Sequence, residues 1–145
     1  MTPTGRHPPL HATAITTFVG GRWRGALLMG SPGSGKSDLA LRLVARGWRL
    51  VGDDYVHVWA SGGRLFAAPV ETIAGQIEAR GLGILDLQHR PASRISLRVD
   101  CVRETVERLP EPQTTAIAGV AVAQMALDIR PASAVETLSL AISRL

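Results

Sequence analysis

The sequence contains few of the residues on which disulfide scaffolds, membrane spans and nucleic-acid surfaces depend. Its single cysteine, Cys101, excludes an internal disulfide and is typical of a reducing compartment. No run approaches the roughly 18 uncharged apolar residues of a membrane-spanning helix. Aromatic residues make up only 4% of the chain, and the arginines are scattered, which argues against a nucleic-acid groove. We therefore expect neither a membrane nor a nucleic acid among its partners.

Lysine is also almost absent, and the position of the one exception is informative. All but one of the 16 basic residues are arginine, whereas Lys36 lies within Gly30-Ser31-Pro32-Gly33-Ser34-Gly35-Lys36-Ser37. A compact ammonium suits a loop that wraps phosphates better than a planar guanidinium does. The spacing fits G-x-x-x-x-G-K-[ST], in which backbone N–H groups cradle phosphates and the Ser hydroxyl binds Mg²⁺. The alternative is a Gly/Ser turn that merely precedes a helix.

The residues on either side favour the phosphate loop over a plain turn. Residues 26–29 form an apolar run, which predicts a buried strand that enters the loop. The helix predicted after the loop ends near Gly47, and its one apolar stripe consists of Leu39, Ala40, Leu43 and Val44. A strand, a glycine-rich loop and a helix in this order aim backbone N–H groups at an anion. We therefore predict a nucleoside triphosphate site at residues 30–37.

The remaining patterns predict an α/β fold with a mixed central sheet and hairpins. The length of 145 residues suits one domain, which we place at residues 10–145 behind a flexible N-terminal lead-in at residues 1–9. Few βαβ repeats are apparent. Besides the phosphate-loop unit, the patterns predict strands at 13–19, 49–52, 94–99 and 116–122, a hairpin at 55–68, a loop-rich region at 71–92, and a C-terminal helix that starts with a Ser133/Glu136 capping box.

Two adjacent carboxylates follow the predicted strand at 49–52. Asp53 and Asp54 come directly after Gly52, and an Asp at the end of a strand beside a phosphate loop is placed to hold a metal ion. A pair permits a division of labour, in which one carboxylate orders Mg²⁺ and the other accepts a proton from an attacking hydroxyl. Asp is also a common turn residue, so a simple turn between two strands is the alternative.

Three motifs occur in order along the chain. They are the phosphate loop with Asp38-Leu39-Ala40-Leu41 after it, the run Arg46-Gly47-Trp48-Arg49-Leu50-Val51-Gly52-Asp53-Asp54, and Ile77-Glu78-Ala79-Arg80-Gly81-Leu82-Gly83-Ile84-Leu85-Asp86. From about His11 to Arg108 the sequence resembles the C-terminal catalytic domain of bacterial HPr kinase/phosphorylase. The resemblance implies a P-loop kinase domain of the HPr kinase/PEP carboxykinase-like fold, in a short form that lacks the family's N-terminal domain.

The resemblance also implies roles for the residues around the phosphate loop. Residues 30–37, with Lys36, would bind ATP, and Ser37, Asp54 and Glu78 would hold Mg²⁺. Asp53 and Asp54 match the acid/base aspartates that take the proton from the serine hydroxyl of HPr. The resemblance does not separate the roles of these two aspartates.

Three further residues match positions with catalytic roles in the family. His11 matches a histidine that manages charge near the transferred phosphoryl group. Arg80 matches a segment tied to both reactions of the family, and Arg108 matches an arginine linked to phosphorolysis. Two of them have a simpler alternative: His11 as an ordinary surface histidine, and Arg80 as half of a surface ion pair with Glu78.

Apart from Asp38, which replaces a usual Glu, two features depart from the family pattern. Pro32 stands where the family's loop usually has Ser, which removes one donor and stiffens the turn. Residues 130–133 stand where a Pro-Gly-Arg-Asn-like stretch would be expected. The second departure makes the phosphorylase reaction doubtful for this chain and weakens the match to the family's oligomer contacts, so a homo-oligomer is left open.

The predicted function is that of an ATP- and Mg²⁺-dependent serine kinase. Its substrate would be HPr or an HPr-like phosphocarrier protein in a bacterial cytoplasm. A P-loop small-molecule kinase or NTPase is one alternative, since it would use the same loop. A non-catalytic ATP-sensing regulatory module is another, against which the intact pair Asp53 and Asp54 argues.

Overall fold

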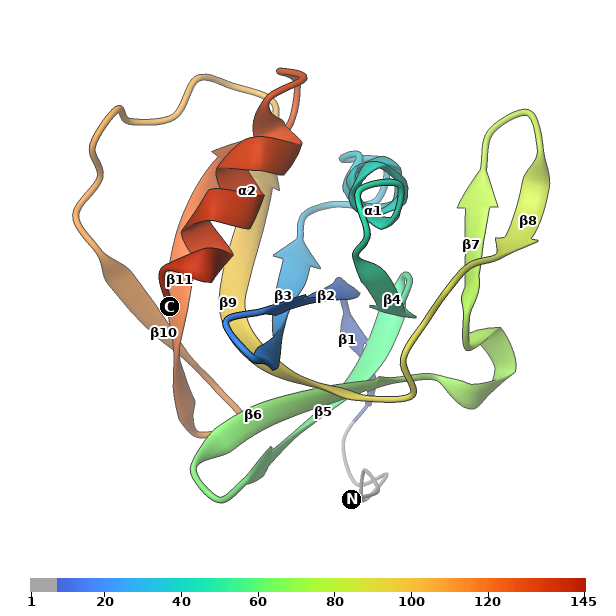
Figure 1. Ribbon diagram of the computed structural model, residues 1–145, viewed down its shortest axis with the longest axis horizontal. Helices are drawn as coiled ribbons and strands as arrows, with labels where there is room; N and C mark the ends of the chain where they lie inside the picture. The colour runs from blue at the N-terminus through green and yellow to red at the C-terminus, as the bar shows by residue number, and fades with distance from the viewer. Residues whose placement is uncertain (1–7) are drawn as a thin grey trace.

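A computed structural model describes residues 8–145, so most of the expected lead-in at residues 1–9 lies outside the described residues. One large mixed sheet carries two helices, α1 (Lys36–Val44) and α2 (Ala134–Ser143) (Figure 1). None of the helices in the described part of the chain is long and apolar enough to cross a membrane. The strands are β1 (Leu10–His11), β2 (Thr13–Val19), β3 (Arg22–Met29), β4 (Arg49–Gly52), β5 (Tyr55–Ser61), β6 (Arg64–Pro69), β7 (Gln76–Ala79), β8 (Gly83–Asp86), β9 (Ser93–Val102), β10 (Gln113–Ile117) and β11 (Val120–Asp128).

Three neighbouring strands of the sheet are parallel and end at one edge. β9 pairs with both β3 and β11, so that Met29 lies opposite Asp100 and Asp128 lies opposite Val102. In open α/β sheets the crevice outside the carboxyl ends of such strands is where ligands bind. The phosphate loop follows β3, and the segments after β9 and β11 therefore emerge at the same edge as this loop.

Strand β4 ends at this edge as well, on the other side of β3. β2 pairs antiparallel with both β3 and β4, in the order β9-β3-β2-β4. Two strands that are both antiparallel to β2 run in the same direction as each other. Asp53 and Asp54, which follow β4, and the segment after β9 therefore flank the phosphate loop from opposite sides.

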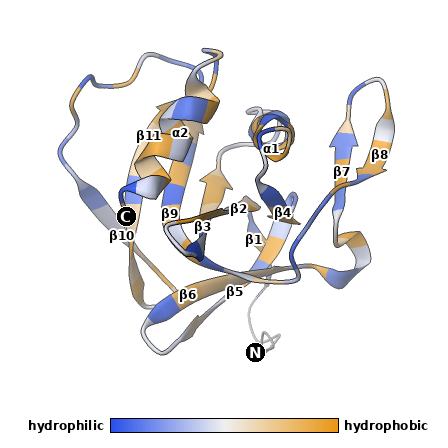
Figure 2. Ribbon diagram, viewed as in Figure 1, coloured by the Kyte–Doolittle hydropathy of each residue, from blue (hydrophilic) through white to orange (hydrophobic). Residues whose placement is uncertain are grey.

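Two apolar cores lie on opposite faces of the sheet. Successive side chains of a strand point to opposite faces, and along β3 Leu28 joins the core beneath the helices, while Leu27 joins the core beside the β5–β6 hairpin. Both leucines are fully buried. Figure 2 shows hydrophobic residues concentrated along the central strands, with hydrophilic residues in the outer loops. The sheet is thus held from both sides, which fixes the edge that carries the phosphate loop.

The region at 71–92, expected to be loop-rich, contains a hairpin of its own. β7 and β8 form a separate two-stranded sheet that stands apart from the main sheet (Figure 1). Apolar residues in and beside it face solvent, since Leu82 is 74% exposed and Ile84 is 70% exposed. β7 alternates over only four residues, with Ile77 and Ala79 buried, and β8 has no buried residue, so the sequence pattern did not reveal the hairpin.

The expectation of one strand at 116–122 is wrong, because the chain reverses in the middle of it. Ala118 and Gly119 have φ of 49° and 78° and separate β10 from β11. A two-residue hairpin loop with positive φ at both positions is usually written Asn-Gly or Asp-Gly. Alanine at the first position concealed the turn.

The Ser133/Glu136 capping box is also absent. Ser133 precedes α2 with φ −72° and ψ −2°, and its side chain makes no capping hydrogen bond. A capping residue normally has an extended backbone, which lets its side chain reach back to the helix N–H groups. The carboxylate of Glu136 instead accepts a hydrogen bond of 2.6 Å from Arg46, which joins α2 to the end of α1.

Helix α2 offers a matched test of the core. Leu138 is fully buried, whereas Leu140, in the same helix, is 59% exposed. We expect Leu138→Ala to lower the free energy of unfolding by about 2–5 kcal/mol, since it leaves a cavity under the sheet. Leu140→Ala should change it by no more than about 0.5 kcal/mol. Urea denaturation of the two variants checks this, and equal losses would contradict the placement of α2.

Candidate active site

The loop between β3 and α1 curls around the ammonium group of its lysine. Lys36 is 5% exposed, and its Nζ donates hydrogen bonds to the carbonyls of Gly30 at 2.8 Å and Ser31 at 3.3 Å. The curl depends on Gly33 and Gly35, whose φ values of 78° and 104° are accessible to glycine without strain. The ammonium is therefore held inside the loop. There its hydrogen bonds can pass from the two carbonyls to phosphate oxygens.

The packing of the loop fits a phosphate group. The Oγ of Ser34 is buried and has no hydrogen-bond partner within residues 8–145, so the loop holds a donor that an anion could satisfy. A Cβ on Gly30 would lie 2.6 Å from that Oγ, and a Cβ on Gly35 would lie 2.6 Å from Cδ1 of Ile129. Gly30 and Gly35 also have φ of 159° and 104°, which L side chains rarely adopt, so both positions favour glycine, in agreement with the G-x-x-x-x-G spacing.

Asp53 is buried at the mouth of the phosphate loop. It is 8% exposed, and its Oδ1 accepts hydrogen bonds from Ser37 Oγ at 2.7 Å and Thr13 Oγ1 at 2.9 Å. Its second carboxylate oxygen accepts none from the residues that the structure describes. One oxygen is thus held by two hydroxyls while the other is available.

Asp54 is held differently, in a strained turn. Its φ is 65°, and the N–H of Tyr55 donates to the carbonyl of Asp53 at 2.7 Å, which closes a three-residue turn around Asp54. This turn with positive φ at its centre is rare and strained, and such strain tends to gather at functional sites. The Asp54 carbonyl accepts a hydrogen bond from the Ala12 N–H at 3.0 Å. Its side chain is 66% exposed, with Oδ1 3.8 Å from Nε2 of His11.

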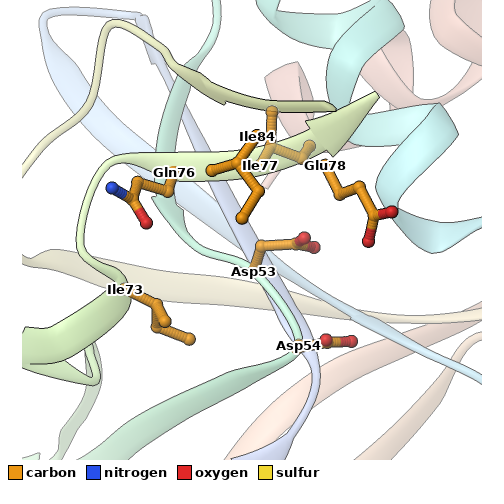
Figure 3. A pocket seen from close by; sticks show the side chains of 7 residues that line it. All are labelled: Asp53, Asp54, Ile73, Gln76, Ile77, Glu78 and Ile84. Atoms are coloured by element: carbon orange, nitrogen blue, oxygen red, sulfur yellow. The ribbon is translucent and has the colours of Figure 1, made fainter. Parts of the chain in front are cut away.

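A small cavity joins the two aspartates to the β7–β8 hairpin (Figure 3). Its volume is about 150 Å³, and it has an acidic part and an apolar part. Glu78 extends from β7 toward the side where the aspartates lie, so the hairpin forms one wall of the site. The lining residues are Asp53, Asp54, Ile73, Gln76, Ile77, Glu78 and Ile84.

The donor set around Ser37 fits Mg²⁺. Among residues 8–145, no three His, Cys, Asp or Glu side chains are grouped as a ready-made metal site. Mg²⁺ is usually held by one or two carboxylates together with substrate phosphates and waters. Ser37 and Asp53, in contact at 2.7 Å, supply oxygen ligands of this kind beside the phosphate loop. The structure therefore brings Asp53, rather than the expected Asp54, against Ser37.

The structure does not bring the two predicted arginines to the aspartates. Arg80 is exposed in the turn between β7 and β8 and does not line the cavity. The described part of the chain has no ion pair between Arg80 and Glu78, contrary to the simpler alternative. Arg108 lies in the exposed segment between β9 and β10, which Figure 1 places at the opposite end of the molecule from the β7–β8 hairpin.

Two residues near the loop were missed from the sequence. Thr13 donates to Asp53, and Nη1 of Arg103 lies 3.6 Å from the position that a Cβ on Gly35 would occupy. Arg103 follows strand β9, and a strand was expected at 94–99. Nothing local in the sequence shows that this strand lies parallel to the one that enters the loop.

The one cysteine lies beneath the loop and should be inert. Burial raises the pKa of the Cys101 thiol from its ordinary value near 9 to about 11; Lys36 opposes this shift and Asp100 adds to it. A rise of two units lowers the thiolate population near pH 8 about 100-fold, and only the thiolate is nucleophilic. We expect Cys101 to react with iodoacetamide at least that much more slowly than free cysteine. Unfolding in urea should abolish the protection, and a fast reaction in the folded protein would contradict the burial.

These features define a protein class: an α/β phosphate-loop fold with a buried carboxylate at a neighbouring strand end. The model of the family described as HPr Serine kinase C-terminal domain matches residues 11–143, and the chain belongs to this family. The solved structure of the Hpr(Ser) kinase/phosphatase from Coxiella burnetii has the same fold, with a TM-score of 0.74 at 24% identity over 96% of this chain and 93% of that one. The predicted α/β fold with a mixed central sheet is confirmed.

Curated relatives are similar over a shorter stretch. The HPr kinase/phosphorylase of Streptococcus thermophilus is 48% identical over 64 residues, which is 43% of this chain and 21% of that protein. The HPr kinase/phosphorylase of Clostridium tetani is 44% identical over 63 residues, with the same two shares. The aligned stretch thus spans about a fifth of the length of these relatives.

Proposed function

We propose that this protein is an ATP- and Mg²⁺-dependent kinase that phosphorylates a serine of HPr or of an HPr-like phosphocarrier, with residues 10–145 acting as one kinase domain. The observation that carries the proposal is the hydrogen bond of 2.7 Å between Ser37 and Asp53 at the mouth of the phosphate loop. It joins the anion-binding loop to an acidic pair that can serve an incoming hydroxyl. Membership of the HPr kinase family supports the choice of acceptor.

The phosphate loop would hold the β- and γ-phosphates of ATP. Lys36 exchanges its hydrogen bonds to the Gly30 and Ser31 carbonyls for phosphate oxygens, and the buried hydroxyl of Ser34 gains a partner. Positioned charges in a site with little water act most strongly on charge that develops in the transition state. The loop thereby stabilises the transferring phosphoryl group and the departing ADP.

Ser37, Asp53 and Glu78 would hold Mg²⁺. The contact between Ser37 and Asp53 favours Asp53 over Asp54 as the carboxylate nearest the loop, and Glu78 faces the same cavity. When bound, the ion neutralises charge on the phosphate oxygens. The hydroxyl of Thr13 keeps the Asp53 carboxylate in this orientation.

Asp54 would act as the general base. The serine oxygen of the acceptor attacks the γ-phosphorus, the bond between that phosphorus and the bridging oxygen breaks, and the serine proton passes to the Asp54 carboxylate. This carboxylate is 66% exposed, so a hydroxyl on another protein can reach it. His11, 3.8 Å away, faces the same carboxylate and can help to balance its charge.

The proposal covers the kinase direction alone. Arg108, which the resemblance links to phosphorolysis, and Arg80, which it ties to both reactions, lie apart from the Asp53–Asp54 pair within this chain. A homo-oligomeric assembly stays a prediction.

Mass spectrometry of HPr from the same genome tests the proposal. After incubation with the wild-type protein and Mg-ATP, we expect one phosphoryl group on a serine of HPr, and none with Lys36→Ala. Unmodified HPr in both reactions would overturn the proposal. In that case, ATP consumption with a small-molecule acceptor would favour a metabolite kinase, and nucleotide binding without turnover would favour a sensing module.

A further inference from the structure

We propose that Arg103 is a second cation of the nucleotide site, which binds the phosphate chain from the flank opposite the aspartates. The inference rests on the proposed function and adds to it a residue that the motifs do not include. Two observations support it: the position of the chain at the end of β9, and the hydrogen-bond partners of the arginines at the edge of the sheet that carries the phosphate loop.

The end of β9 follows the phosphate loop along its length. The carbonyl oxygen of Cys101 lies 3.4 Å from the position of a Cβ on Gly30, the first residue of the loop. Nη1 of Arg103 lies 3.6 Å from the corresponding position on Gly35, where the loop enters α1. Gly35 is the residue before the first turn of α1, whose free N–H groups attract anions. The guanidinium of Arg103 is therefore beside the part of the loop that binds phosphate.

Arg103 is also the arginine at this edge whose charge is available. Arg130 is engaged by Asp128 at 2.9 Å, and Arg42 donates to the carbonyls of Ile129, Pro131 and Ala132. Arg103 is exposed, and no hydrogen bond or ion pair joins it to any other described residue. The pKa of Asp128 is lowered mainly by its hydrogen bond with Arg130 and to a smaller extent by the charge of Arg103, which agrees with a guanidinium held near the ends of β9 and β11.

The strand order sets the flank on which Arg103 acts. β9 and β4 lie on opposite sides of β3, so Arg103 and Asp53 approach the loop from opposite sides. Transfer requires the terminal phosphate to face the aspartates. A cation on the β9 flank therefore meets the rest of the phosphate chain, and a planar guanidinium can donate two parallel hydrogen bonds to phosphate oxygens.

Nucleotide affinity of charge-matched variants tests this role. By calorimetry, Arg103→Gln should bind ADP about 10- to 100-fold more weakly than wild type, which is the usual effect of losing a hydrogen bond to a charged group. Pyrophosphate should lose affinity by a similar factor, whereas Arg103→Lys should recover part of the loss. In the kinase assay the KM for ATP should rise more than kcat falls. Arg144→Gln, which removes the same charge from an exposed residue after α2, should bind ADP like wild type.

The possible failures can be told apart. If wild type and Arg103→Gln bind ADP equally well, the inference is overturned and the proposed kinase stands. An equal loss in Arg144→Gln would show a general effect of net charge and would also overturn it. If the wild type binds no nucleotide, the proposed function and the inference fail together. Arg103 is exposed, so an unchanged melting temperature should confirm that the variant is folded.

Discussion

Asp54→Asn should slow phosphoryl transfer to the serine hydroxyl about 10²- to 10⁴-fold, the usual contribution of a positioned general base. The amide keeps the shape of the side chain but cannot accept the proton. Asp54 has no contact with the phosphate loop among the described hydrogen bonds, so the affinity for ADP should stay close to that of wild type. The measurements are kcat at saturating Mg-ATP and HPr, and the Kd for ADP by calorimetry.

The neighbouring aspartate is the matched control for this variant. Asp53→Asn changes one atom at the adjacent position, but Asp53 is 8% exposed and accepts hydrogen bonds from Ser37 and Thr13. We expect this variant to need more Mg²⁺ for half-maximal activity, a change that Asp54→Asn should not show. If both variants show the same magnesium dependence and the same loss of kcat, the division of roles between the two aspartates is wrong.

Lys36→Met should lower kcat by at least about 10²- to 10³-fold, the range for removing one preorganised charge-stabilising donor. Methionine preserves much of the length of the side chain, so the loop keeps its packing but loses the ammonium. Affinity for ATP should fall as well, because the donor to the β- and γ-phosphates is gone. Steady-state kinetics with HPr and calorimetry with a non-hydrolysable ATP analogue measure the two effects, and an active Lys36→Met protein would contradict the proposed site.

Lys36→Arg asks whether the position requires a point charge. Lys36 is 5% exposed and its ammonium lies 2.8 Å from the Gly30 carbonyl, whereas a guanidinium is larger and planar. We expect Lys36→Arg to stay far below wild-type activity although it keeps the charge. Arg46, which is exposed just after α1, provides a control with the opposite substitution. Arg46→Lys should keep full activity. Full activity of Lys36→Arg would show that charge alone suffices.

The core of the site could be predicted from the sequence because it is local. The strand, the loop and the helix occupy consecutive residues. The glycines stand where a Cβ would collide or where φ is positive, as at Gly30 and Gly35. The position of Asp53 directly after a short strand was visible for the same reason. Where the local signal was weak, as at Ala118 and in the exposed β7–β8 hairpin, the predicted elements were wrong or missing.

Short-range patterns in the sequence by themselves determined the strand–loop–helix unit, the need for one lysine and the acidic pair. Only the tertiary structure decided which aspartate contacts Ser37, that Glu78 shares their cavity, and that Arg103 lies beside Gly35. The physical reason is strand pairing: β9 pairs with β3 on one side, and β4 joins the sheet on the other side through β2, by hydrogen bonds between segments far apart in the chain. Periodicity and turn residues indicate which segments are strands, but they do not indicate which strands become neighbours.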